Sequence, residues 1–147
     1  MYKHILIPTD GSALSRKAIA NGVKLAKSVG ARVTGLFAAP PATPVVYKNF
    51  VPVDYMTPRK HAEMIEKIAA KYLGIIERAA KHAGVRCRCI HLTSDFPADA
   101  ILAVAKKQKC DLIFMASHGR RGLAGVLLGS ETQKVLIHSR IPVLVSR

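Results

Sequence analysis

Short apolar segments alternate with longer segments of helical periodicity along the whole chain, and this alternation restricts the fold more than any other feature. The segments with strand-like length and composition are 4–10, 31–39, 85–92, 111–115 and 140–146. The segments with one apolar helical stripe are 13–29, 61–82, about 95–109 and 131–138. Strict alternation of this kind predicts an α/β fold: a parallel sheet with right-handed crossovers and helices on both faces. A length of 147 residues fits one domain, 1–147.

Composition and charge restrict the class of protein further. Half of the residues are apolar, which is typical of a globular chain, yet no apolar run is long enough to span a bilayer. The first residues lack the apolar segment of a signal peptide, so we expect a cytoplasmic protein without membrane contact. The net charge of +14 favours anionic ligands. The basic residues are scattered and tryptophan is absent, so we expect a charged surface and no dedicated nucleic-acid groove.

The segment 116–130 joins an apolar strand to a helix through a glycine-punctuated loop. Ser130 and Gln133 have the spacing of a capping box, which predicts a helix start there. Glycines allow a ligand close to the backbone, and free N–H groups at a helix start favour anions, so the pattern indicates a phosphate site. Alternatively, the glycines are ordinary loop residues and Ser130 is only a helix cap, in which case the segment binds no phosphate. The loop is neither a Walker A sequence nor Gly-x-Gly-x-x-Gly.

Asp10 follows the first predicted strand, as the glycine loop follows the fourth. In open parallel sheets, ligands bind beyond the carboxyl ends of the strands where the strand order reverses. If the first and fourth strands flank that point, Asp10 and the loop converge there. The alternative role for Asp10 is to cap the turn at Gly11-Ser12.

Two other segments have unusual composition. Cys87, Cys89 and His91 alternate on one strand face, which raises the possibility of a metal site. Their spacing matches no common zinc pattern, so buried free cysteines in a reducing compartment are the favoured interpretation, and we expect no metal site. The proline-rich segment 40–58 is too long for an ordinary connection, and we expect it to close over a bound ligand.

Several motifs together resemble the universal stress protein family over the whole chain. They are Ile5-Leu6-Ile7-Pro8-Thr9-Asp10-Gly11-Ser12, Cys110-Asp111-Leu112-Ile113, Ser117-His118-Gly119-Arg120-Arg121-Gly122-Leu123, Leu127-Leu128-Gly129-Ser130 and Pro142-Val143-Leu144-Val145. Nucleotide-binding members carry Gly-x2-Gly-x9-Gly followed by Ser or Thr. Here Gly119 and Gly129-Ser130 fit that pattern, whereas Ala116 replaces its first glycine. The resemblance implies a flavodoxin-like or Rossmann-like open sheet of five strands in the order 3-2-1-4-5.

The resemblance also implies a ligand, a site and an assembly. The ligand is ATP, or ADP or AMP, with Mg²⁺ on the triphosphate. Pro8, Thr9, Asp10 and Ala38 would contact the adenosine, and the phosphates would lie on the loop and the helix start. The residues implied there are Met115, Ala116, Ser117, His118, Gly119, Arg120, Gly129, Ser130 and Glu131. The last strand, with Val143, Leu144 and Val145, would pair with a second copy to form a homodimer.

These expectations describe a stress-response sensor or adaptor with no catalytic residues. Two alternatives remain open. A slow ATP hydrolase, or a relative of the ATP pyrophosphatases, would share the architecture, but those enzymes carry Ser-Gly-Gly-x-Asp-Ser where this chain has Thr9-Asp10-Gly11-Ser12. A basic dimeric adaptor without nucleotide would account for Ala116 and for the charge of +14.

Overall fold

The computed structural model describes residues 1–41, 57–119, 125 and 127–147. The elements alternate along the chain as β1 (His4–Pro8), α1 (Ala13–Val29), β2 (Arg32–Ala39), α2 (Pro58–Ala83), β3 (Cys87–Thr93), α3 (Pro97–Lys107), β4 (Leu112–Ala116), α4 (Ser130–His138) and β5 (Val143–Ser146). The strands form one five-stranded parallel sheet in the order β3-β2-β1-β4-β5. The predicted α/β class and strand order are therefore confirmed.

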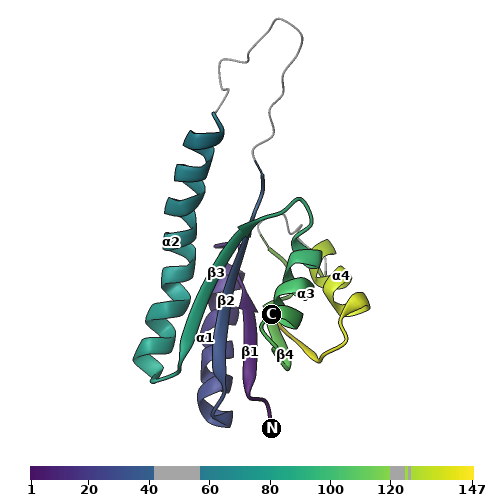
Figure 1. The fold of residues 1–147 in the computed structure, drawn as a ribbon. Coiled ribbons are helices and arrows are strands. Elements are labelled where there is room, and N and C mark those ends of the chain that lie inside the picture. Colours follow the sequence, from purple (N-terminus) through teal and green to yellow (C-terminus); the bar gives the residue numbers. More distant parts are fainter. Residues whose placement is uncertain (42–56, 120–124, 126) are drawn as a thin grey trace, which may run out of the picture.

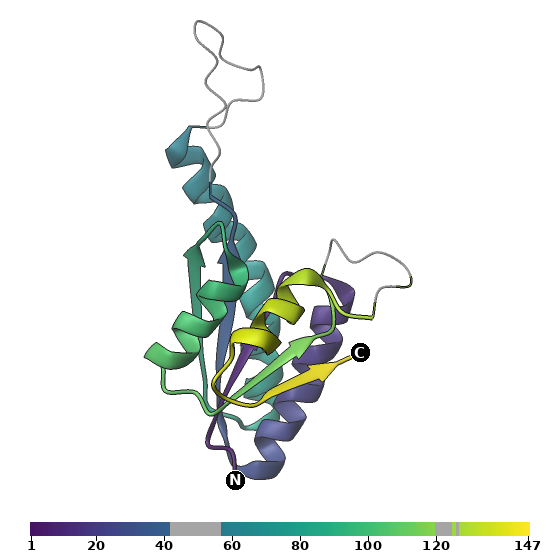
Figure 2. The same cartoon turned by 90° about the vertical axis from the view of Figure 1, so that its right-hand side faces the viewer.

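Helices cover both faces of the sheet. α1 and α2 lie on one face (Figure 1), and α3 and α4 lie on the other, which faces the viewer in Figure 2. Because side chains alternate along a strand, β1 contributes Ile5 and Ile7 to the core beneath α1 and α2, and Leu6 to the core beneath α3 and α4. All three side chains are completely buried. This two-sided burial explains why the central strands are almost wholly apolar.

Local signals define the ends of the two long helices. Ser12 caps α1 by accepting a hydrogen bond from the Ser15 N–H at 3.1 Å, and Gly30 ends the helix with φ +68°. Thr57 caps α2 in the same way, with Pro58 in the first turn, and Gly84 ends it with φ +72°. α2 thus begins three residues before the predicted start, because Thr57 and Pro58 form a helix start inside a proline-rich segment.

Two predictions concern residues outside the described part. Most of the segment 40–58, expected to close over a ligand, falls in the undescribed range 42–56, and Arg120 falls in 120–124. Among the residues that the structure describes, no helix has both the length and the apolar character needed to cross a membrane.

Candidate functional site

The connection from β1 to α1 is a turn held by its own side chains. Thr9 is buried, and its hydroxyl accepts hydrogen bonds from the Ser15 hydroxyl at 2.7 Å and from the Gly11 N–H at 3.2 Å. Asp10 Oδ1 accepts from the Ser12 N–H at 3.0 Å, so Asp10 does cap the turn. Gly11 has φ +78°, and a Cβ there would overlap the Tyr72 ring. The turn therefore fixes the backbone at the carboxyl end of β1.

Gly119 brings the loop after β4 against this turn. A Cβ added to Gly119 would overlap Asp10 Oδ2, so any side chain there would displace the carboxylate. β1 and β4 are neighbours in the sheet, and the strand order reverses between them, since β2 and β3 lie beyond β1 and β5 lies beyond β4. Asp10 and Gly119 thus meet at the point where ligands bind in open parallel sheets.

A second glycine brings α4 to the same place. A Cβ at Gly129 would lie 3.0 Å from both Cα and Cβ of His118. The Gly129 N–H donates to the Ser117 carbonyl at 2.7 Å, and the Ser117 N–H donates to the Ser146 carbonyl at 2.8 Å. His118 is half-buried, and its Nδ1 lies 3.2 Å from the Ser117 hydroxyl. The start of α4 is therefore held directly against the carboxyl end of β4.

The predicted capping box at Ser130 is wrong. Gly129 is the N-cap residue, Ser130 is the first helical residue and is exposed, and the N-cap residue makes no side-chain hydrogen bond to the helix. Gln133 instead uses its side-chain amide to bond the Leu128 carbonyl at 3.1 Å, while its N–H bonds the Gly129 carbonyl at 3.0 Å. A helix start without a side-chain cap leaves its first N–H groups and its positive dipole end for another acceptor.

Glu131 points away from the start of its own helix. Its Oε2 accepts a hydrogen bond from the Ala98 N–H at 2.9 Å, and its Oε1 lies 3.1 Å from Lys134 Nζ. α3 begins at Pro97 without a side-chain cap from its own N-cap residue, so Glu131 supplies an acceptor for the Ala98 N–H in the first turn of α3. The Glu131 side chain therefore connects α4 to α3, and its backbone N–H remains at the α4 start.

The other predicted residues have apolar side chains at or near the carboxyl ends of their strands. Ala116 ends β4 within the core beneath α1, and it has no positive φ, so this replacement of glycine creates no backbone strain. The Met115 side chain packs in the opposite core, beneath α3 and α4. Pro8 ends β1, and Ala38, which is half-buried, lies near the carboxyl end of β2. Their side chains shape the sheet edge more than they offer polar contacts.

Two buried hydroxyls that support the site were not singled out from the sequence. Ser15 holds Thr9, as described above, and Thr132 Oγ1 donates to the Ala116 carbonyl at 3.0 Å. Both are almost fully buried. The sequence does contain a signal for these two residues. Ser15 in α1 and Thr132 in α4 are small polar residues on the inward side of their helices, where only apolar residues would be expected.

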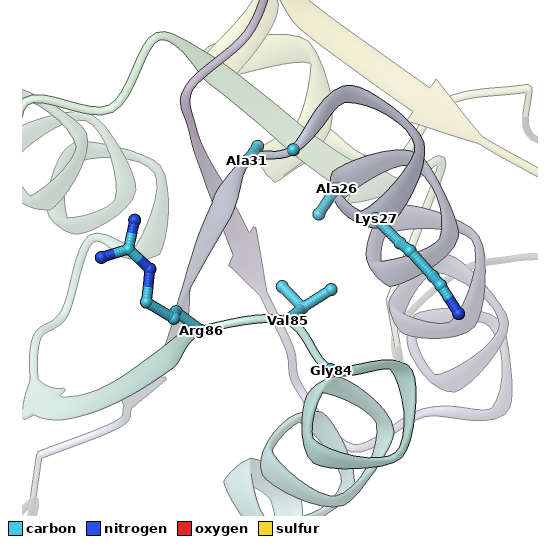
Figure 3. Close-up of a pocket in the computed structure, with 7 residues that line it drawn as sticks. Ala26, Lys27, Ala31, Gly84, Val85 and Arg86 are labelled. Carbon is cyan, nitrogen blue, oxygen red and sulfur yellow. The ribbon is translucent and has the colours of Figure 1, made fainter.

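Two hollows in the described surface lie at the opposite edge of the sheet. One of about 150 Å³ lies between the ends of α1 and α2; Figure 3 shows Ala26 and Val85 facing each other across it. A wider one includes His4, Arg32 and Asp111. Burial opposes ionisation of Asp111, but the N–H groups of His4 and Lys3 donate to its carboxylate and keep its pKa below the usual value. This edge carries the helix C-termini, which favour cations, but its wider hollow is also lined by Lys3, Arg32, Arg86 and Lys109.

The cysteines are free, as expected, but the expectation that Cys87 and Cys89 are buried is wrong. Cys87 and Cys89 are free but half-buried, whereas Cys110 is free and buried. β3 is an edge strand, in agreement with the predicted strand order. Within the described residues, His, Cys, Asp and Glu side chains form no group of three or more able to hold a metal ion.

Comparison with known proteins extends these observations to a family. The model of the universal stress protein family matches residues 1–147. The universal stress protein YxiE of Bacillus subtilis is 32% identical over 150 residues, with all of both chains covered. The solved structure of MJ0577 from Methanocaldococcus jannaschii is 27% identical, covers 99% of this chain and 95% of that one, and has a TM-score of 0.79.

A universal stress protein solved in complex with cAMP has the same fold, with a TM-score of 0.70 at 24% identity; it covers 99% of this chain and 97% of that one. The two sequence motifs that meet in the fold, around Asp10 and around Gly119, are those that resembled this family. With its whole length matched, the chain belongs to the universal stress protein family.

Proposed function

We propose that the chain binds an adenine nucleotide at the carboxyl edge of β1 and β4, with the phosphates at the start of α4. The observation that carries this proposal is the pair of close backbone approaches, Gly119 against Asp10 and Gly129 against His118. They place a helix start whose N-cap residue, Gly129, supplies no side-chain hydrogen bond beside a fixed acidic turn at the strand-order reversal. A helix start of this kind favours phosphate oxygens.

Each part of the edge has a proposed role in binding. The N–H groups of Ser130, Glu131 and Thr132 would donate to phosphate oxygens, and the exposed Ser130 hydroxyl would add a further donor. Asp10 would accept hydrogen bonds from the ribose while keeping its bond to the Ser12 N–H. Gly119 would allow the phosphates to approach the backbone. Ala38 would lie beside the base at the end of β2.

The nucleotide-bound relative supports the choice of ligand. That universal stress protein was solved with cAMP, which carries an adenosine and a phosphate. Family membership supports a role in the stress response. We propose a sensor or adaptor in the cytoplasm that binds ATP, ADP or AMP, with Mg²⁺ accompanying ATP, and with hydrolysis slow at most.

We further propose that β5 forms the contact between two copies of the chain. β5 lies at the edge of the sheet, and Leu144 exposes 39% of its surface there. An apolar sheet edge is stabilised by pairing with a second strand. Leu144→Glu is expected to give a monomer by light scattering. Ile137→Glu, which places the same charge on the exposed side of α4, is the matched control and should remain dimeric. Equal masses for both variants and the original would contradict this assembly.

Nucleotide binding is tested by extraction followed by calorimetry. Protein purified without added nucleotide is denatured, and the released small molecules are identified; emptied protein is then titrated with Mg-ATP. The proposal predicts a dissociation constant on the order of micromolar, lost in Gly119→Val. Gly84→Asn, a glycine replacement in open space at the opposite edge, is the control and should bind normally.

A null result in this experiment has a defined meaning. If no adenine nucleotide is released and the emptied protein gives no binding heat, the nucleotide proposal is overturned. A basic dimeric adaptor then becomes the better account of the chain. Its binding to polyanions would fall steeply as salt concentration rises, whereas a nucleotide held in a site responds less.

A further inference from the structure

A pair of thiols lies on the edge strand β3, away from the proposed nucleotide site. The Sγ atoms of Cys87 and Cys89 are 3.9 Å apart, and both side chains are partly exposed. The Cys89 thiol also lies 3.8 Å from the Leu73 carbonyl of α2. Gly35 is opposite Cys89 in β2, and a Cβ at Gly35 would come within 2.8 Å of Cys89 Sγ. The absent side chain of Gly35 therefore makes the space that the sulfur fills.

The strand geometry disfavours a disulfide between these thiols. Two residues apart on one strand, same-face Cβ atoms are about 6.6 Å from each other. A disulfide needs its Cβ atoms about 3.5–4.5 Å apart. Cys87 and Cys89 are both in register with β2, opposite Val33 and Gly35, so forming the disulfide would distort a paired strand.

A bridging metal ion needs no such distortion. Zinc–thiolate bonds, taken as a guide, are about 2.3 Å long, so two such bonds in line span about 4.6 Å. That is about 0.7 Å more than the present 3.9 Å between the sulfurs, a change that side-chain rotation supplies. The two thiols are thus spaced for chelation and not for oxidation to a disulfide.

The number of ligands selects the class of metal. Zinc in structural sites takes four ligands, but no third His, Cys, Asp or Glu in the described part of the chain completes a group with these thiols. His91 shares their strand face but is exposed and does not join them. A soft monovalent ion is satisfied by two thiolates. We propose that Cys87 and Cys89 form a two-coordinate site for copper(I).

Copper(I) binding to the two thiols involves no change of oxidation state. Two sulfur–copper bonds form, two S–H bonds break, and both protons pass to solvent, which leaves a site of net charge −1. The two thiols already lie within hydrogen-bonding distance of each other. The hydrogen bond with Cys89 lowers the pKa of Cys87, although burial and Glu77 oppose this effect. The same hydrogen bond, burial and Glu77 raise the pKa of Cys89. Copper(I) therefore replaces two thiol protons, and the Glu77 carboxylate disfavours the resulting anion.

The test titrates the intact protein with copper(I) under anaerobic conditions against the chromophoric competitor bicinchoninate. One copper per chain is expected, with a thiolate-to-copper absorption in the ultraviolet. Cys87→Ser and Cys89→Ser should each lose more affinity than the roughly 100-fold caused by losing an outer-shell contact. Cys110→Ser is the matched control, because Cys110 lies in the opposite core and burial raises its pKa to about 11. Glu77→Gln should bind copper more tightly.

Other results would overturn the assignment. Copper binding unchanged in Cys87→Ser or Cys89→Ser, or equally reduced in Cys110→Ser, would show that the pair is not the site. Weaker binding in Glu77→Gln would make Glu77 a ligand and exclude a two-coordinate site. If the serine variants do not fold, alkylation of the unaltered chain decides: copper(I) must protect both Cys87 and Cys89, and continued labelling of either one contradicts the proposal. None of these outcomes depends on nucleotide binding.

Discussion

The backbone of Gly119 lies so close to the Asp10 carboxylate that a methyl group at position 119 would overlap Oδ2. This contact joins the turn after β1 to the loop after β4. It is the local consequence of placing β1 and β4 side by side in the sheet.

The two glycines of the site are expected to differ in their tolerance of alanine. In Gly119→Ala the Asp10 side chain can rotate away, at the cost of its bond to the Ser12 N–H. In Gly129→Ala the new methyl meets Cα and Cβ of His118, which cannot rotate away. Gly129→Ala should therefore lose about 1–3 kcal/mol of unfolding free energy, and Gly119→Ala less. Urea unfolding of both variants tests this order, and the reverse order would contradict it.

The bond between Glu131 and the Ala98 N–H should stabilise the start of α3. Glu131→Ala is expected to cost about 1 kcal/mol, as for a lost helix cap, and to speed hydrogen exchange at the Ala98 amide. Glu63→Ala is the control, because its ion pair with Arg59 is highly exposed and should contribute little. Unchanged exchange at Ala98 would show that Glu131 does not serve α3.

His4 should make stability depend on pH. Burial, followed by the nearby Arg32, lowers the pKa of His4 below 6.5 in the folded chain. The unfolded chain therefore binds more protons below pH 6.5, so the unfolding free energy should fall as pH decreases through that value. The stability is fully present above this pH. His4→Gln should flatten the dependence, while the same change at the exposed His138 should not. Equal slopes for all three proteins would contradict this prediction.

Gly35 and Cys89 should be energetically coupled. A methyl at Gly35 would lie 2.8 Å from Cys89 Sγ and 2.9 Å from Ile76 Cδ1. Gly35→Ala is therefore expected to cost about 1–3 kcal/mol, and less in a Cys89→Ala background, where one obstruction is gone. A double-mutant cycle by chemical denaturation measures the coupling. If the free-energy changes of the two substitutions are strictly additive, the two positions are not coupled, and the strand instead moves as a whole to accommodate the methyl group at position 35.

Much of the fold follows from local patterns in the sequence. Ser12, Gly30 and Gly84 define helix ends by their own chemistry, and the apolar segments identify every strand of the sheet. The meeting of Asp10 with the glycine loop also followed, because parallel strands with a known order place their carboxyl ends together.

The details that could not be predicted depend on distant residues. Ser130 and Gln133 match a capping box, but the contact of Gly129 with His118 starts the helix one residue earlier. The partner of Glu131 is Ala98, which lies far away in sequence and carries no side-chain signal. A local sequence pattern shows which hydrogen bonds are possible, whereas packing between distant residues determines which of them form.

The most direct test of the account is the location of nucleotide binding in solution. Backbone amide shifts of the labelled protein are compared with and without Mg-ATP. The account predicts the largest changes at Asp10, Gly119 and the start of α4 at Ser130. Changes centred instead on Arg32, Arg86 and Lys109 at the opposite edge, or no changes at all, would contradict it.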